Sequence, residues 1–219
     1  MRKIQFQNEH YYHIYNRGVD KRDIFMDDKD YFRFLRTMRE LNDIEPIESL
    51  YRQDQLKRQE AKPLRFAEAN RSGLASFTAY CLNPNHYHFL LKQTVDDGIS
   101  KFMHKLSTGY TRYFNEKYSR SGSLFQGPFK AVEIKSDSQL NYVSAYINGN
   151  PEIHKISKVD KWIWSSYLEY LGERDGTMCN KNIILNDFED KEDYKNYLEN
   201  VIKNSQEIKE EIKACLIEL

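Results

Sequence analysis

The chain has 219 residues, with 33 Lys and Arg balanced by 33 Asp and Glu. This length suits one domain with an appendage. No apolar run approaches the roughly 18 residues that a membrane span needs, and the N-terminus lacks the apolar core of a signal peptide. We therefore expect a soluble cytoplasmic protein without a membrane partner. The three cysteines are widely spaced and form no C-x-x-C pair, which argues against a disulfide framework or a structural zinc site.

The zero net charge hides an asymmetry along the chain. Residues 1–170 hold 26 Lys and Arg against 21 Asp and Glu, whereas residues 171–219 hold 7 against 12. Nucleic-acid phosphates call for a basic surface, which only the first of these segments offers. We predict a functional domain at residues 1–170 and an acidic, mostly helical tail at residues 171–219, which docks on the domain or binds a partner.

The first part of the domain alternates between strand and helix patterns. Residues 10–18 are aromatic and alternating, as in a strand that ends at a glycine turn, and apolar residues recur at helical spacing over residues 31–41. Arg17, at the end of this strand, is either a phosphate contact or a solvated surface side chain. Residues 43–73 are charged and have no sustained period, which predicts a long insertion.

Two histidines follow the insertion at the start of a strand. Residues 75–82 and 87–92 have strand patterns and flank an Asn-Pro-Asn turn. Because side chains alternate along a strand, His86 and His88 are expected on the same face, close enough to share one cation. A histidine pair of this spacing also occurs for packing alone, so a metal site needs support from elsewhere in the chain.

The second part of the domain repeats the alternation of helix and strand. Apolar residues between 102 and 114 form one stripe of a long helix, and residues 130–135 alternate as a strand. A helix over residues 138–150 must end near Pro151, because the residue before a proline disfavours the helical conformation. The element order predicts an α+β fold, a ferredoxin-like βαββαβ sandwich with an antiparallel sheet and helices on one sheet face.

The helix before Pro151 carries two groups that complement the histidine pair. Tyr146 and Asn150 are four residues apart, which predicts that they share a helix face. Two imidazoles and an amide oxygen would leave coordination positions open on Mg²⁺ or Mn²⁺, of which Mn²⁺ tolerates imidazole better. Such a cation can polarise a phosphodiester and orient an attacking phenolate.

Five blocks of the chain carry a resemblance: residues 12–18, 82–91, 113–115 with 122–127, 146–151 and 164–167. In these blocks the sequence resembles the single-tyrosine HUH transposases, an IS200-like group, and most closely their REP-associated tyrosine transposases. The resemblance implies that His86 and His88 are metal ligands and that Asn150 supplies or contacts the third ligand. It implies that Tyr146 attacks single-stranded or hairpin DNA, giving a 5′-phosphotyrosine link and a free 3′-hydroxyl. Two positions depart from the family pattern: Gly149, directly before Asn150, and Pro128, where the family usually has arginine.

Several alternatives stay open. Tyr142 lies one turn before Tyr146, so the two could act as a pair in a rolling-circle type of initiator, although we favour packing for Tyr142. The chain could also be a domesticated DNA- or RNA-binding regulator, or a nuclease that uses water in place of tyrosine. The oligomeric state, monomer or homodimer, is undecided. The candidate contacts to the DNA backbone are Arg17, Lys101, Lys105, Arg112 and Lys130.

Overall fold

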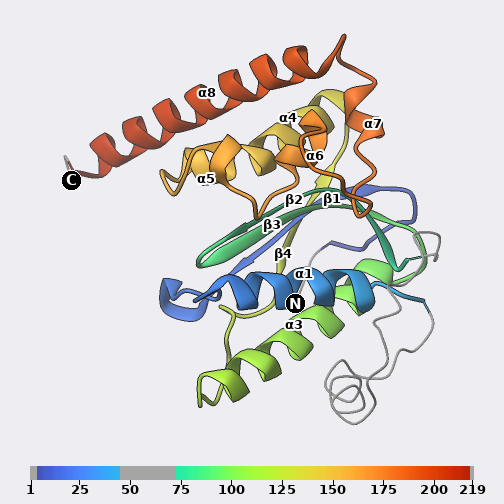
Figure 1. The fold of residues 1–219 in the computed structure, drawn as a ribbon, viewed down its shortest axis with the longest axis vertical. Helices are drawn as coiled ribbons and strands as arrows, with labels where there is room; N and C mark the ends of the chain where they lie inside the picture. The colour runs from blue at the N-terminus through green and yellow to red at the C-terminus, as the bar shows by residue number, and fades with distance from the viewer. Residues whose placement is uncertain (1–3, 45–72, 218–219) are drawn as a thin grey trace.

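A four-stranded antiparallel sheet is the centre of the fold (Figure 1). The computed structural model describes residues 4–44 and 73–217, with side chains described up to residue 208. The predicted insertion at 43–73 therefore lies, except for its ends, outside the described residues. The spatial order of the strands is β2-β3-β1-β4. Their bounds are β1 Tyr11–Arg17, β2 Ala75–Asn83, β3 His86–Gln93 and β4 Lys130–Ile134.

Two helices, α1 (Asp28–Glu40) and α3 (Gly98–Lys117), lie together on one face of this sheet (Figure 1). Asp27 caps α1 by accepting a hydrogen bond from the Asp30 backbone N–H. The core between helices and sheet is aromatic and fully buried. The strand order and the two helices give the ferredoxin-like βαββαβ arrangement, so the predicted fold class is confirmed. Members of this core include Tyr12, Ile14, Phe34, Tyr87, Phe89 and Phe102.

The opposite sheet face is covered by the helices that follow β4 (Figure 1). Ala79 and Leu90 of the sheet share a second buried core with Ile147 of α4 and Leu198 of α8. The first part of the acidic tail therefore docks on the domain. The remaining elements are α4 Asp137–Asn148, α5 Asn150–Ile153, α6 Tyr167–Leu171, α7 Asn182–Leu185 and α8 Lys191–Ile217, with short 3-10 turns at Val19–Lys21 and Val159–Lys161.

The edge strand β2 is protected by the aromatic segment that precedes α6. The backbone N–H of Leu82 donates to the carbonyl of Trp164 at 2.9 Å, and that of Ser166 donates to the carbonyl of Tyr80 at 2.9 Å. The Trp162 indole donates to the Leu82 carbonyl at 3.1 Å. These bonds satisfy backbone groups that an open sheet edge would expose.

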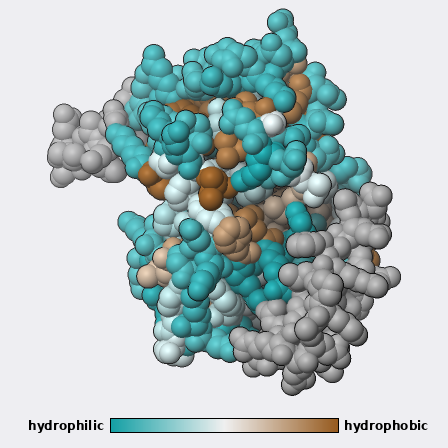
Figure 2. Space-filling model, in the orientation of Figure 1, coloured by the Kyte–Doolittle hydropathy of each residue, from teal (hydrophilic) through white to brown (hydrophobic). Residues whose placement is uncertain are grey.

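The outer surface is mainly hydrophilic on the face seen in Figure 2, where hydrophobic residues form small, separate patches. This face includes the helices that cover both sides of the sheet. Within the described ranges, no helix combines the length and apolar character required to traverse a membrane.

Candidate active site

The antiparallel pairing of β1 and β3 sets the position of the histidine pair. In this register Tyr15 lies opposite His88 and Arg17 lies opposite His86. Opposed residues project to the same face, and the neighbouring β1 residues face α1 and α3, so the pair faces α4. The two imidazole centroids are 5.2 Å apart. His86 and His88 thus lie side by side beneath the helix that carries Tyr146.

Hydrogen bonds orient the ring of His86. Its Nδ1 is 2.6 Å from Oδ1 of Asn85, an acceptor, which assigns the ring proton to Nδ1. The other nitrogen, Nε2, is 2.9 Å from Nδ2 of Asn83 and 3.2 Å from Oδ1 of Asn150. The lone pair of Nε2 is therefore directed towards two side-chain amides.

His13 holds the second histidine of the pair. Its Nε2 lies 2.9 Å from Nδ1 of His88, which is 7% exposed. Burial lowers the pKa of His13 to about 4, so its imidazole is neutral at pH 7. The sequence analysis did not single out His13, although strand alternation places residues 13, 15 and 17 on one face.

Tyr146 of α4 stands over these rings. Its ring centroid is 5.9 Å from that of His88 and 6.2 Å from that of His13, both in edge-on geometry. Burial raises the pKa of Tyr146, and the nearby side-chain amide of Asn150 opposes the rise. The phenol is therefore protonated at neutral pH and must lose its proton to act as a nucleophile.

Asn150 belongs to a separate short helix, which corrects the predicted single helix over 138–150. Helix α4 ends at Asn148, and α5 begins at Asn150 with Pro151 in its first turn, a position where the missing proline N–H costs nothing. Gly149 between them keeps right-handed helical angles, with φ −79° and ψ −7°. The chain therefore changes helix between Tyr146 and Asn150 while both remain beside the histidines.

Gly149 is explained by the approach of the tail helix. A Cβ atom at this position would lie 2.7 Å from Cγ1 of Ile202 in α8, closer than real Cβ contacts allow. The glycine therefore lets α8 pack against the junction of α4 and α5. Its backbone amide is also fixed, because it donates to the carbonyl of Ala145 at 2.8 Å.

Asn83 is a further member of the site that the sequence analysis did not assign. It lies opposite His86 in the β2–β3 register and is fully buried. Its Nδ2 donates to Oδ1 of Asn150 at 2.5 Å and is 2.9 Å from Nε2 of His86. Within the described chain, the buried Nδ2 of Asn150 has no hydrogen-bond partner. Groups from β2, β3 and α5 therefore converge on one point.

A third histidine approaches the pair from α5. His154 is exposed at the C-terminal end of α5, and its ring centroid is 4.8 Å from that of His86. Its spacing of four residues from Asn150 is that of one helix face, as for Tyr146 and Asn150. The predicted helix ended before Pro151, however, so His154 was not assigned to the site.

The five candidate DNA contacts divide between the two sheet faces. Arg17 and Lys130 lie on the face of the site: the Nε of Arg17 donates to Oε1 of Gln126, and Lys130 lies opposite Tyr15. The structure does not bring the other three to the site, because they belong to α3 on the far side of the sheet. These three are Lys101, Lys105 and Arg112.

Tyr142 is 43% exposed, so it is not the packing residue that we expected. Its ring lies nearly parallel to that of Tyr146, with centroids 6.4 Å apart and an interplanar angle of 19°. The rings of the two tyrosines therefore stack one turn apart on α4. Of these two rings, that of Tyr146 is the one that contacts the histidines in the described structure.

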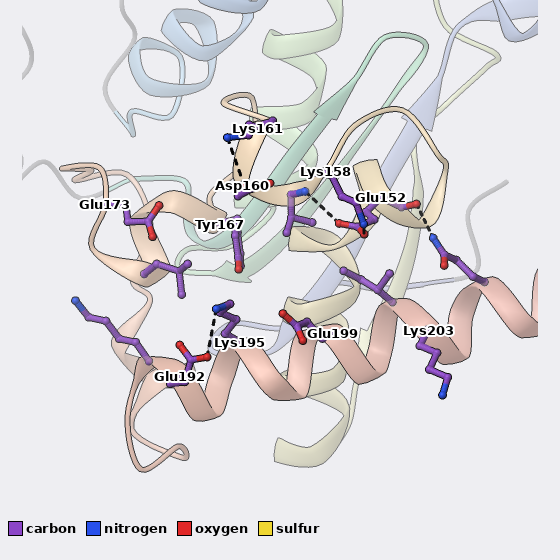
Figure 3. A pocket seen from close by; sticks show the side chains of 15 residues that line it. Glu152, Lys158, Asp160, Lys161, Tyr167, Glu173, Glu192, Lys195, Glu199 and Lys203 are labelled. Atoms are coloured by element: carbon purple, nitrogen blue, oxygen red, sulfur yellow. Dashed lines mark hydrogen bonds and ion pairs between the residues drawn. The ribbon is translucent and has the colours of Figure 1, made fainter.

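A cavity of about 840 Å³ lies elsewhere, between α8 and residues 152–173 (Figure 3). Its wall mixes lysines with carboxylates, as in the pairs Lys195–Glu192 at 3.2 Å and Lys161–Asp160 at 3.7 Å. Neither the histidine pair nor Tyr146 lines this cavity. The converging side chains on the sheet, rather than the larger hollow, make the better candidate site.

Comparisons with known proteins bear on this site. The family model described as "Transposase IS200 like" matches residues 49–150. The solved structure of a REP-associated tyrosine transposase bound to a REP hairpin has 13% identity and a TM-score of 0.51, covering 81% of this chain and 88% of that chain. The tRNA(His) guanylyltransferase of Saccharomyces cerevisiae, at 8% identity, covers 90% of this chain and 74% of its own, but its TM-score of 0.35 supports no conclusion. No curated protein matches the chain.

The matched segment contains the central part of the site. Residues 49–150 include β2, β3 and α4, and with them the histidine pair, Tyr146 and Asn150. The REP-associated transposase structure shares the fold at 13% identity. The resemblance inferred from the sequence blocks is therefore confirmed: residues 49–150 match the IS200-like transposase family model, and the described structure has the fold of a REP-associated tyrosine transposase.

Proposed function

We propose that this protein is a transposase that cuts and rejoins single-stranded DNA with Tyr146 as its nucleophile. The observation that carries the proposal is the convergence of Tyr146, His88, His86 and Asn150 from three different elements. A phenol over two imidazoles and a buried amide is suited to attack on a phosphodiester whose charge is stabilised at the same point.

The donor set fits a divalent cation with open coordination positions. Nε2 of His86 and Oδ1 of Asn150 lie 3.2 Å apart, and His88 could complete the set. The amide oxygen of Asn150 would add a third donor to the two imidazoles. Imidazole nitrogens with an amide oxygen suit Mn²⁺ and, less well, Mg²⁺. When bound, the cation would polarise the scissile phosphate.

The protein residues then account for bond making and bond breaking. Oη of Tyr146 attacks phosphorus and loses its proton, and the bond from phosphorus to the 3′-oxygen breaks. The DNA 5′ end becomes a phosphotyrosine, and the departing 3′-oxygen takes up a proton. No water is consumed, so a 3′-hydroxyl can reverse the step and join strands without ATP. Arg17 and Lys130 would hold neighbouring phosphates on the sheet face.

The proposed substrate is DNA with a hairpin and single-stranded flanks. Two observations support it: the family match and the likeness to a transposase whose structure holds a REP hairpin. The face of the site also carries Arg17 and Lys130, which suit a phosphate backbone.

One rival function has a specific observation in its favour. The exposed, parallel ring of Tyr142 beside Tyr146 would suit a pair of nucleophiles, as in a rolling-circle type of initiator. In that case either tyrosine could become linked to DNA. We favour a single nucleophile because Tyr146, not Tyr142, makes ring contacts with His13 and His88 in the described structure.

Covalent capture of labelled hairpin DNA in the presence of Mn²⁺ tests the proposal. We expect Tyr146→Phe to abolish the protein–DNA adduct on a denaturing gel and Tyr142→Phe to retain it. An adduct in Tyr146→Phe would refute the assignment of the nucleophile. Cleavage in that variant with a free 5′-phosphate would indicate attack by water, and DNA binding by the parent protein without any adduct would favour a domesticated regulator.

A further inference from the structure

We infer that Tyr142 is a stacking platform for an unpaired nucleobase next to the scissile phosphate. The inference rests on the proposed function, which places that phosphate at Tyr146, and adds a binding subsite to it. Three features of Tyr142 carry it: its exposure, the orientation of its ring, and its distance from the catalytic side chains.

The exposure of Tyr142 has no structural explanation in the fold. Other tyrosines on this side of the sheet are fully buried, as Tyr170 and Tyr194 show with 0% exposure. The Tyr142 side chain is 43% exposed to solvent. Val132, which pairs with His13 on the sheet face that carries the site, is 44% exposed. Exposed apolar surface beside a functional site is typical of a binding surface.

The ring orientation suits a flat ligand. The plane of Tyr142 lies 19° from that of Tyr146, so one face of Tyr142 is turned to the nucleophile ring. On the other side of the site, the Tyr15 ring lies 23° from that of His88, with centroids 5.7 Å apart. Aromatic rings in this arrangement stack on nucleobases without regard to sequence, because every base has a π face.

Charge favours a nucleic acid over other flat ligands. Lys130 lies opposite Tyr15 with its Nζ 6.0 Å from that ring, and Arg17 ends the same strand opposite His86. Phosphates on either side of a stacked base would therefore meet the cations Arg17 on β1 and Lys130 on β4. A base within a duplex is already stacked on its neighbours, so the subsite selects an unpaired base in the flank of a hairpin.

Binding of fluorescein-labelled oligo(dT) and of a hairpin with dT flanks tests the inference. The measurements use full-length Tyr146→Phe without divalent metal, so that no cleavage occurs. Adding Tyr142→Phe keeps the aromatic ring and should leave Kd within about twofold, whereas Tyr142→Ala should raise it by about 5- to 150-fold. Phe32→Ala removes an aromatic ring that is more exposed than Tyr142, at 63%, from α1 on the far sheet face, and should leave Kd unchanged.

An abasic residue moved along the flank identifies the stacked base. At one position of the flank, the abasic residue should weaken binding to the protein that retains Tyr142. At the same position it should have no further effect on binding to the Tyr142→Ala variant. Equal affinity of Tyr142→Ala and Tyr142→Phe, or equal loss in both, would overturn the inference while leaving the nucleophile assignment intact. Absence of DNA binding by Tyr146→Phe itself would overturn both the inference and the proposed substrate.

Discussion

Replacing His13 with phenylalanine should weaken metal binding without removing a proposed ligand. For His88 to bind a cation through Nε2, its proton must be on Nδ1, and the acceptor for that proton is Nε2 of His13 at 2.9 Å. Phenylalanine keeps the ring shape and removes the acceptor. A buried donor left without a partner costs about 1–3 kcal/mol. The loss of such a support for a histidine ligand typically weakens metal affinity about 10- to 100-fold.

Titration calorimetry with Mn²⁺ measures this effect directly, without relying on DNA cleavage. His13→Gln provides the control, because its Oε1 can occupy the position of Nε2 and should restore most of the affinity. His10→Phe, at a 44% exposed position paired with Glu133, should bind Mn²⁺ as the parent protein does. Parent-like affinity in His13→Phe would refute the role of His13. If the parent protein binds no Mn²⁺ while His86→Ala behaves identically, the proposed metal site itself is wrong.

Two further predictions concern the framework around the site. In urea unfolding, Asp30→Ala should lower the free energy of unfolding by about 3 kcal/mol. The substitution leaves Lys117 and the hydroxyls of Tyr113 and Tyr118 without their buried carboxylate. The control Asp28→Ala, at an exposed position, should change the free energy of unfolding by less than about 0.5 kcal/mol. Gly149→Ala should cost about 1–3 kcal/mol through its clash with Ile202, and a double-mutant cycle with Ile202→Ala should show partial recovery; strict additivity would contradict the close contact.

The order of elements could be predicted from the sequence because each has a clear local pattern. Alternating aromatics mark β1, and the acidic run before residue 31 marks the start of α1. The end of the helix after β4 was placed less well. Proline excludes helix before it but is accepted in a first helical turn, so Pro151 marked the start of α5 rather than the end of α4. Local sequence rules alone could not decide whether Pro151 ends one helix or begins the next, because that choice also depends on the packing of α8 against the junction of α4 and α5.

The candidate site could be predicted only in part, for a physical reason. Strand periodicity places His86 and His88 on one face of β3, and helix periodicity groups Tyr146 with Asn150, because each pattern is a local property. His13 and Asn83 join them through strand pairing, and register between distant strands depends on the whole sheet. The exposure of Tyr142 likewise depends on which surface of α4 the sheet and the tail leave uncovered.

The acidic tail bears on the proposed nucleophile Tyr146, because the tail fixes the helix that carries this side chain. The hydroxyl of Tyr194 in α8 accepts a hydrogen bond from Nδ2 of Asn148 at 2.9 Å, and Oδ1 of the same amide accepts one from Ser166 at 2.7 Å. These bonds hold the last turn of α4 between Tyr146 and Asn150. A division at residue 170 therefore separates segments that share one core, and the geometry of the site depends on both.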